Sequence, residues 1–340
     1  MPVPFRNLRR RRCWGLGWWV WQSFGEKNKS VKVRVFIGLL LTLAVSGRAQ
    51  TLIETFGSGT NQFSIEFVTI GNPGNAALSG FGAVNYTYRI GKYETSRSIV
   101  EKANTAGSLG LTMSTGLTLD QPVIGLSWNE AARFVNWLNT SKGYQAAYKF
   151  TTSGRNDNLT LWGAGESSGT NQFRHKDAFY FLPSIDEWFK AAYYDPTRNS
   201  GAGGYWSYAT QSNASPTMVT GGTAANTAVY GGSGFAPANV TNAGGLSYYG
   251  TMAQNGNAWD LVETAKDGVN NDPTESRGIR GGKKGYDFGL SSSEYPFGNL
   301  PTQESSDVSF RVAMVPEPSA GALLVLGAGV LAVIRRRKKD

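Results

Sequence analysis

Cysteine and histidine are almost absent: the 340 residues contain one cysteine, Cys13, and one histidine, His175. A single cysteine allows no disulfide bond within the chain. A redox pair of cysteines, or a zinc site of cysteine and histidine ligands, needs more of these residues than the chain has. The sequence also lacks a G-x-S-x-G nucleophile turn and a G-x-x-x-x-G-K-[ST] phosphate loop. These absences exclude the commonest thiol, zinc, serine-hydrolase and P-loop chemistries.

The positive charge lies at the two ends of the chain. Lys and Arg number 33 against 24 Asp and Glu, a formal net charge of +9. Residues 1–49 hold ten basic residues and one acidic residue, and residues 316–340 hold five and two. Residues 50–315 therefore have a net charge of −3. Such a distribution indicates targeting signals rather than a nucleic-acid partner.

A secretory signal is predicted within residues 1–49. Basic residues precede an apolar run, Val35–Val45, and small residues follow at Gly47 and Ala49, the expected positions before a cleavage site. The mature protein would start near Gln50, and the alternative is a core helix. Because residues 1–30 exceed what a signal peptide needs, we expect a start at Val31 or Val33. A long n-region or a membrane-surface anchor is the alternative for that segment.

A three-part signal ends the chain at residues 316–340. An apolar stretch, predicted as a transmembrane helix over 319–334, lies between a Pro-Glu-Pro motif and a basic cluster. Its 15-residue apolar run would span about 22 Å, less than the roughly 30 Å of a bilayer core, and snorkelling basic side chains can cover the difference. The motif and cluster consist of Pro316, Glu317, Pro318, Arg335, Arg336 and Arg337.

This order resembles the PEP-CTERM sorting signal. The resemblance implies recognition by an exosortase, cleavage near the Pro-Glu-Pro motif and export to the cell surface or an exopolysaccharide matrix. The basic cluster would stay on the cytoplasmic side, which places residues 50–315 outside the membrane. The alternative is a permanent tail anchor in the inner membrane.

Two helices are predicted in the middle of the chain, over 127–139 and 184–196. Ser127 with Glu130, and Ser184 with Glu187, form capping boxes ahead of apolar residues at helical spacing. Short strands are predicted over 63–70, where apolar and polar residues alternate, and over 86–94, where they alternate more loosely, with brief strands over 279–281 and 310–314. The many glycines, 43 of 340 residues, indicate a loop-rich domain over 63–315, preceded by a linker over 50–62.

Six segments in this order resemble the formylglycine-generating enzyme (sulfatase-modifying factor) family. The resemblance implies an α+β, C-type-lectin-like fold, loop-rich, with short antiparallel strands and two main helices. The segments are GAVNYTYRIGKYE (82–94), PVIGLSWNEAARFVNWLN (122–139), FLPSIDEWFKAAYYDP (181–196), GTMAQNGNAWD (250–260), RGIRGG (277–282) and FRVA (310–313).

The chemistry of the family is missing from this chain. The resemblance implies copper(I) held by two cysteines five residues apart, just after the R-G-G block, and the matching positions here are Tyr286 and Ser291. Relatives that bind iron use three histidines, and here only His175 exists, which we expect to be a solvated surface residue. The domain is therefore expected to be non-catalytic, a pseudoenzyme.

A calcium site is implied by the family's G-N-x-W-E segment. It matches Gly256, Asn257 and Trp259, followed by Asp260 in place of the glutamate. Carboxylate and amide oxygens suit calcium, so the expected ligands are Asn257, Asp260 and Glu263. Further oxygen ligands would come from Asp267, Asn270, Asn271 and Asp272. The alternative is a capped turn over a buried tryptophan, with solvated acidic residues after it.

The expected function is that of an exported surface or matrix protein whose domain is a binding or structural module. A basic patch near Gly281 and Gly282, made by Arg280, Lys283 and Lys284, would receive an acidic exopolysaccharide or a carboxylate of another surface protein. Two alternatives remain. One is an enzyme without cysteine or histidine chemistry, either a metal-assisted hydrolase that uses Asp260, Glu263 and Asp267 or a divergent sulfatase-modifying factor. The other is a membrane-anchored assembly factor.

Overall fold

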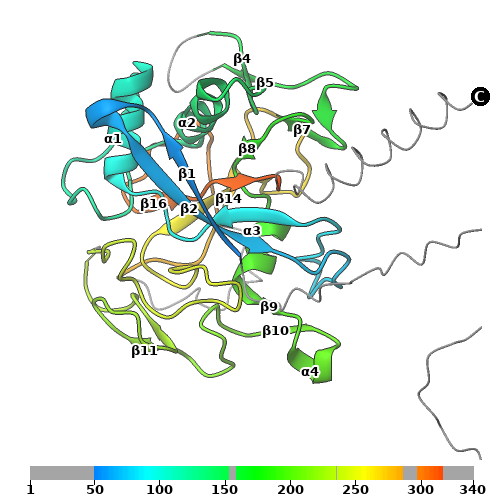
Figure 1. The fold of residues 1–340 in the computed structure, drawn as a ribbon, viewed down its shortest axis with the longest axis vertical. Helices are drawn as coiled ribbons and strands as arrows, with labels where there is room; N and C mark the ends of the chain where they lie inside the picture. The colour runs from blue at the N-terminus through cyan, green and yellow to red at the C-terminus, as the bar shows by residue number, and fades with distance from the viewer. Residues whose placement is uncertain (1–49, 153–157, 235, 286–296, 317–340) are drawn as a thin grey trace, which may run out of the picture. The chain divides into compact units, whose positions relative to one another are not determined.

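Two sheets of short strands form the centre of the domain (Figure 1). The computed structural model describes residues 50–152, 158–234, 236–285 and 297–316. The five-stranded sheet has the order β1 (Thr51–Phe56), β2 (Phe63–Ile70), β3 (Tyr88–Gly91), β17 (Ala313–Met314), β8 (Tyr180–Phe181). The four-stranded sheet has the order β15 (Gly298–Asn299), β14 (Arg277–Arg280), β13 (Trp259–Ala265), β16 (Val308–Phe310).

The segment over 50–62, predicted to be a linker, belongs to the domain. Its residues 51–56 form β1, which pairs antiparallel with β2 from Thr51 opposite Val68 to Phe56 opposite Phe63. The prediction was wrong because only Phe56 at the end of β1 is fully buried, so the strand carries a weak apolar pattern. Since β1 and β17 lie in the same sheet, both ends of the domain close on one layer.

The chain passes from one sheet to the other at its C-terminal end. The sequence predicted one strand over 310–314, but the structure has two, β16 and β17, separated by Arg311 and Val312. β16 pairs parallel with β13, because the chain returns to that strand after the long excursion through β14 and β15. β17 pairs antiparallel with β3 and β8. The strands are therefore mostly, not wholly, antiparallel.

Both predicted helices are present, and a third was missed. α2 (Trp128–Ser141) and α3 (Ile185–Tyr193) begin with complete capping boxes, as predicted. α1 (Arg97–Gly107) begins after Ser96, whose side chain accepts a hydrogen bond from Ile99 N. It escaped prediction because only Val100 and Ala103 are fully buried, which leaves a narrow apolar stripe.

The start of α2 packs on the four-stranded sheet through Trp128. The indole is fully buried, and its Nε1 donates to the carbonyl oxygen of Val262 in β13 at 3.0 Å. The ring of Tyr148 meets it edge-on at 5.0 Å between centroids, and the Arg277 guanidinium lies 4.9 Å from its ring centre. Farther along α2, Phe134 packs edge-on against Phe310 of β16. The helix and the sheet therefore share one core.

The remaining elements are short and lie in loops. The loop segment around β11 lies below the two sheets in Figure 1. Four strand pairs and two short helices complete the described chain: β4 (Lys149–Phe150) with β5 (Leu159–Thr160), β6 (Ser167–Ser168) with β7 (Asn171–His175), β9 (Tyr194–Asp195) with β10 (Gly204–Tyr205), β11 (Thr217–Met218) with β12 (Thr227–Ala228), η1 (Gly59–Asn61) and α4 (Arg198–Gly201). The α+β, loop-rich prediction is confirmed.

Two terminal predictions lie outside the described residues. These are the signal sequence within 1–49 and the helix over 319–334. Among the helices that the structure does describe, none has the length and apolar character needed to cross a bilayer.

Candidate functional site

The family segments over 250–260 and 277–282 lie against each other. Gly256 N donates to the carbonyl oxygen of Gly281 at 2.7 Å, and both glycines have φ of +95°. A Cβ on Gly256 would overlap the carbonyl oxygen of Val229. Only glycine adopts this conformation readily and leaves room for the neighbouring backbone. Gly256 is therefore required by the close approach of the Val229 backbone, and Gly281 by its positive φ.

A buried ion pair joins Asp260, which follows Gly256 closely in the sequence, to Arg311. Arg311 Nε donates to Asp260 Oδ2 at 2.7 Å, and both side chains are almost completely buried. Trp188 of α3 also donates its Nε1 to Asp260 Oδ2, at 2.9 Å. The remaining Arg311 nitrogens donate to the carbonyl oxygens of Lys92 and Met252. One guanidinium thus joins β13, the segment after β3 and the loop before the G-N-x-W segment.

Glu94 lies beside this pair as a second buried carboxyl group. Its Oε1 accepts from Ala258 N at 3.0 Å and its Oε2 accepts from Asn257 Nδ2. Burial, followed by the negative charge of Asp260, raises the pKa of Glu94 to about 8. Burial also raises the pKa of Asp260, and the Arg311 charge opposes that rise.

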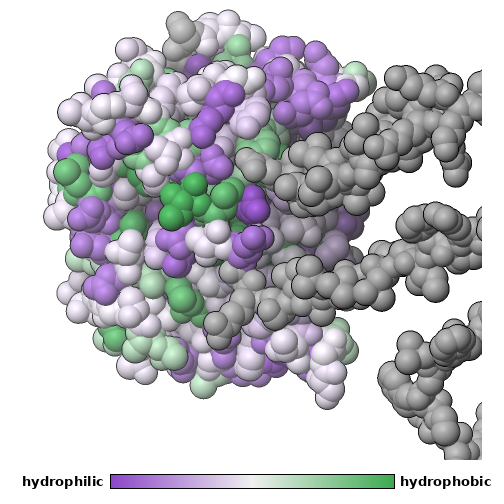
Figure 2. Space-filling view, viewed as in Figure 1, coloured by the Kyte–Doolittle hydropathy of each residue, from purple (hydrophilic) through white to green (hydrophobic). Residues whose placement is uncertain are grey.

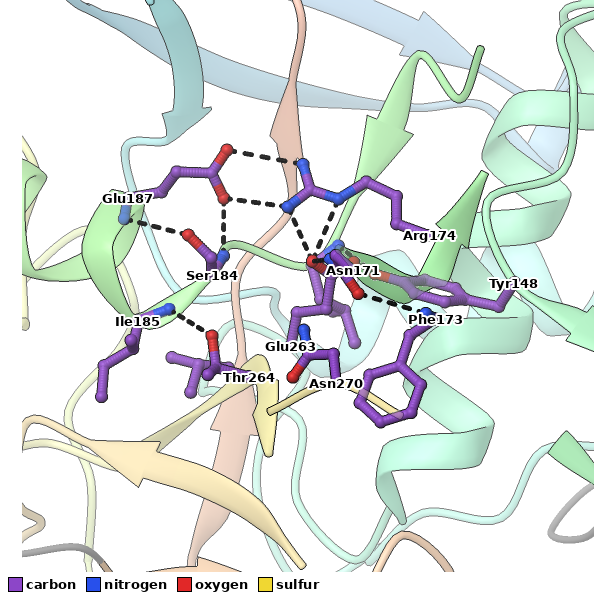
Figure 3. Close-up of polar contacts among 12 residues, drawn as sticks. Tyr148, Asn171, Phe173, Arg174, Ser184, Ile185, Glu187, Glu263, Thr264 and Asn270 are labelled. Carbon is purple, nitrogen blue, oxygen red and sulfur yellow. Dashed lines mark hydrogen bonds and ion pairs between the residues drawn. The ribbon is translucent and has the colours of Figure 1, made fainter. Parts of the chain in front are cut away.

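A separate buried network surrounds Glu263 (Figure 3). Arg174 Nη2 donates to Glu263 Oε2 at 2.6 Å, and Tyr148 donates its hydroxyl to Oε1 at 2.9 Å. The same guanidinium contacts both oxygens of Glu187, the capping residue of α3, at 3.4 Å. Burial raises the pKa of Glu263, and the Arg174 charge opposes this rise. This network connects β7, the first turn of α3 and β13.

The structure does not bring the expected calcium ligands together. Asn257 Oδ1 accepts from Ala238 N at 2.7 Å, so Asn257, Asp260 and Glu263 each belong to a different set of hydrogen bonds. One oxygen, Asp260 Oδ1, is buried without a hydrogen-bond partner among the described residues. Within the described chain, no three acidic, histidine or cysteine side chains converge as metal ligands. Calcium binding stays a prediction that this geometry does not favour.

The acidic residues proposed for a hydrolase are also separated. Asp267 follows β13 on the surface, where its Oδ1 accepts from Val269 N at 2.7 Å. Asp260 and Glu263 are buried in the two networks described above. The trio therefore does not line a common cleft, and these contacts favour the alternative of a turn over the buried Trp259.

The predicted basic patch is not a patch of available charges. Lys283 forms an ion pair with Asp307. Lys284 is buried and donates to the carbonyl oxygen of Gly231 at 2.6 Å. Arg280 is 4% exposed and lies over the ring of Phe81. The prediction was wrong because these cations, adjacent in sequence, serve as contacts between loops.

His175 is also not a solvated surface residue. It is 9% exposed, its ring meets Trp162 edge-on at 4.6 Å, and its Nδ1 accepts from Asp177 N at 3.1 Å. Its charged neighbours in sequence misled the prediction, because Arg174 points inward to Glu263.

Glu94 and Arg311 were not assigned a role from the sequence. Both lie within quoted family segments, and Arg311 is a charged residue inside a short strand-like stretch of apolar neighbours, whereas Glu94 has mostly polar neighbours. The pattern around Arg311 is the available signal, since a charge in such a place needs a buried partner. Tyr286 and Ser291, at the positions matched to the copper ligands, lie outside the described residues.

A pocket of about 450 Å³ opens between α1 and β2. Its most buried polar lining residues are Glu94 and Thr95, 2% and 5% exposed. Ile53 of β1, 64% exposed, also lines it. Figure 2 shows hydrophobic surface over β1 and β2 beside hydrophilic surface. The buried polar centre of the domain therefore reaches solvent through this pocket.

Comparison with known proteins identifies two matching families. The model of the sulfatase-modifying factor enzyme 1-like domain matches residues 53–315. The model of the PEP-CTERM protein-sorting motif matches residues 315–338. Both resemblances predicted from the sequence are thereby confirmed. No curated protein matches the sequence significantly.

Two solved structures have a similar fold. CarF superposes with a TM-score of 0.51 at 19% identity, over 74% of this chain and 99% of its own. Variable protein 1 of Treponema denticola superposes with a TM-score of 0.51 at 16% identity, over 78% and 99%. At these identities the likeness shows the fold alone, and it confirms the predicted fold class.

The protonation of Glu94 predicts a dependence of stability on pH. The pKa of Glu94 in the folded chain, about 8, exceeds its value in an unfolded chain, so the folded state binds the proton more tightly. Its contribution to stability is complete below about pH 4.5 and is lost as the pH rises towards 8. Between about pH 5.5 and about pH 7.5 we expect it to lower the free energy of unfolding by roughly 2 kcal/mol.

Urea unfolding of the wild type and of Glu94→Gln across this pH range measures the effect. The difference between the two proteins should change with pH, whereas Glu166→Gln, at an exposed glutamate, should follow the wild type. Parallel pH profiles for wild type and Glu94→Gln would contradict the assignment.

Proposed function

Because the chain belongs to the family of sulfatase-modifying factor enzyme 1-like domains and ends in a PEP-CTERM sorting motif, we propose that it is an exosortase-sorted extracellular protein whose domain is a non-catalytic binding or structural module. The sorting motif implies recognition by an exosortase and export through the cell envelope to the surface. The role of the domain after export is the part that we infer.

The absence of thiolates carries the proposal. The only cysteine of the chain, Cys13, lies in the N-terminal extension, ahead of the predicted cleavage after Ala49. Copper(I) needs soft thiolate ligands, and the matched residues Tyr286 and Ser291 offer none. The donor set therefore does not fit the copper site that the family implies.

The hydrogen bonds of the buried polar residues support the same conclusion. Asp260, Arg311 and Glu263 are buried, and their hydrogen bonds connect strands and helices. A catalytic acid or base must reach its substrate, and these groups face protein donors instead. The polar centre of the domain supports the fold, which leaves the surface for recognition.

An oxidation assay tests the non-catalytic role. The mature protein, loaded with copper(I) and given oxygen, should leave a cysteine-containing sulfatase peptide unchanged, because no thiolate pair holds the metal. Peptide mass spectrometry detects conversion to the aldehyde, and an active family member serves as the positive control. Conversion of the peptide by this chain would overturn the proposal.

Exosortase sorting predicts a shortened C-terminus. Protein recovered from outside the cell should lack Arg335–Asp340, and the variant with Pro316, Glu317 and Pro318 replaced by alanine should stay with the membrane fraction. Mass spectrometry of intact protein and fractionation of cells measure both effects. An intact basic tail on the wild-type protein would favour the membrane-anchored assembly factor instead.

A further inference from the structure

Both ends of the domain leave the five-stranded sheet on the same side. Thr69 N donates to the Gln50 carbonyl oxygen at 3.1 Å. In β3, Arg89 pairs with Thr69 on one side and with Met314 of β17 on the other. Gln50 and Met314 therefore belong to one row across the sheet, three strand spacings or roughly 14 Å apart. We call this side, which includes Gln50 and Val315, the exit end. α1 lies at the other end of the sheet, where it contacts η1 in the turn from β1 to β2 (Figure 1).

Only short stretches of chain connect the exit end to the two predicted membrane segments. The match to the sorting motif begins at Val315, directly after β17, and the predicted transmembrane stretch begins at residue 319. The four residues 315–318 span at most about 14 Å when fully extended. Four residues also separate Gln50 from Val45, the last residue of the apolar run of the predicted signal. Since the headgroup layer on each side of a bilayer is roughly 5–7 Å thick, an inserted tail holds the exit end at the headgroups or just above them.

A stacked aromatic pair lies beside the departing chain at the exit end. Val315 N donates to the Phe179 carbonyl oxygen at 3.1 Å, and the Phe179 ring stacks on Tyr144 at 4.5 Å between centroids. Tyr144 and Val315 are 39% and 37% exposed. Tyrosine is enriched at the membrane–water interface, because its ring is apolar and its hydroxyl is polar. These side chains therefore suit the headgroup region towards which the chain leads.

Arg89 adds a positive charge to the exit end. Its side chain is half-buried, and its Nε donates to Thr69 Oγ1 at 3.2 Å. No acidic side chain pairs with Arg89 within the described part of the chain. Lys142, two residues before Tyr144, is by contrast paired with Glu54 at 3.0 Å. The charge of Arg89 is therefore available to attract the phosphate of a lipid headgroup.

We propose that the exit end is a membrane-contact surface, which rests on the lipid headgroups of the bilayer while the C-terminal tail is attached. Tyr144 and Val315 enter the headgroup layer, and Arg89 attracts a lipid phosphate. This inference rests on the proposed function, because the tail must hold the chain in the membrane before sorting. A surface of so few side chains binds weakly by itself, so cleavage of the tail releases the domain.

Fluorescence quenching by labelled lipids tests the contact. The chain with its tail is purified from the membranes of a host without an exosortase and reconstituted in vesicles of phosphatidylethanolamine and phosphatidylglycerol. Because signal cleavage removes Cys13, a single introduced cysteine carries the dye.

Two positions for the dye are compared. Gln145→Cys places it at an exposed residue beside Tyr144. Leu119→Cys places it at a 49% exposed residue whose carbonyl oxygen accepts from Ser98 N at the start of α1. Lipids with a nitroxide on the headgroup should remove most of the fluorescence at position 145 and little at position 119. Equal quenching at the two positions overturns the proposal.

Variants at the surface separate a specific contact from simple tethering. A domain that is only tethered rotates freely, so the dye is quenched similarly at both positions. Tyr144→Ser should reduce the difference between the positions, and Tyr144→Ser combined with Arg89→Gln should remove most of it. Leu300→Ser is the matched control, at a 52% exposed residue near the start of α2, the opposite end of that helix from Tyr144. It should change nothing, and melting temperatures confirm that each variant is folded. A difference that survives the double variant overturns the surface.

The remaining outcomes concern the partner and the proposed function. A difference between the two positions that appears only with exosortase in the vesicles assigns the surface to that enzyme and overturns the membrane contact. A chain that a carbonate wash removes from the vesicles also overturns it, because the tail is then not inserted. Equal quenching together with a shortened C-terminus on exported protein overturns the surface and leaves the proposed function intact. The proposed function fails on a different result, the formation of aldehyde in the oxidation assay.

Discussion

The ion pair between Arg311 and Asp260 is the interaction on which the domain depends. Arg311 lies at the point where the chain leaves one sheet and enters the other, and Asp260 lies near the start of β13. Trp188 adds α3 to the same carboxylate. Since two opposite charges are desolvated together, either one without the other would be strongly unfavourable. The sheets and α3 are therefore held in one arrangement.

The rest of the polar centre follows from this constraint. Burial, followed by the Asp260 charge, raises the pKa of neighbouring Glu94, whose two carboxyl oxygens accept hydrogen bonds from the G-N-x-W segment. Gly256 and Gly281 allow that segment to approach the R-G-G turn. The buried motif residues thus serve the fold, because their side chains form hydrogen bonds with other parts of the protein.

The sequence predicted the features that local rules control. The capping boxes at Ser127 and Ser184 and the family order of segments were sufficient for α2, α3 and the fold. Long-range partners were not visible: Lys284 and His175 looked solvated, yet Lys284 is buried against Gly231 and His175 against Trp162. The roles of Arg311 and Glu94 depend on packing between sheets, which a single sequence does not contain.

A double-mutant cycle on Asp260→Asn and Arg311→Met, measured by urea unfolding of the mature protein, tests the central claim most directly. Each single variant should lose about 3–5 kcal/mol of unfolding free energy, because a buried group is left without its partner. The double variant should lose less than the sum of the two, by roughly 1–3 kcal/mol. Single variants within about 0.5 kcal/mol of the wild type, a change typical of surface positions, would contradict the account.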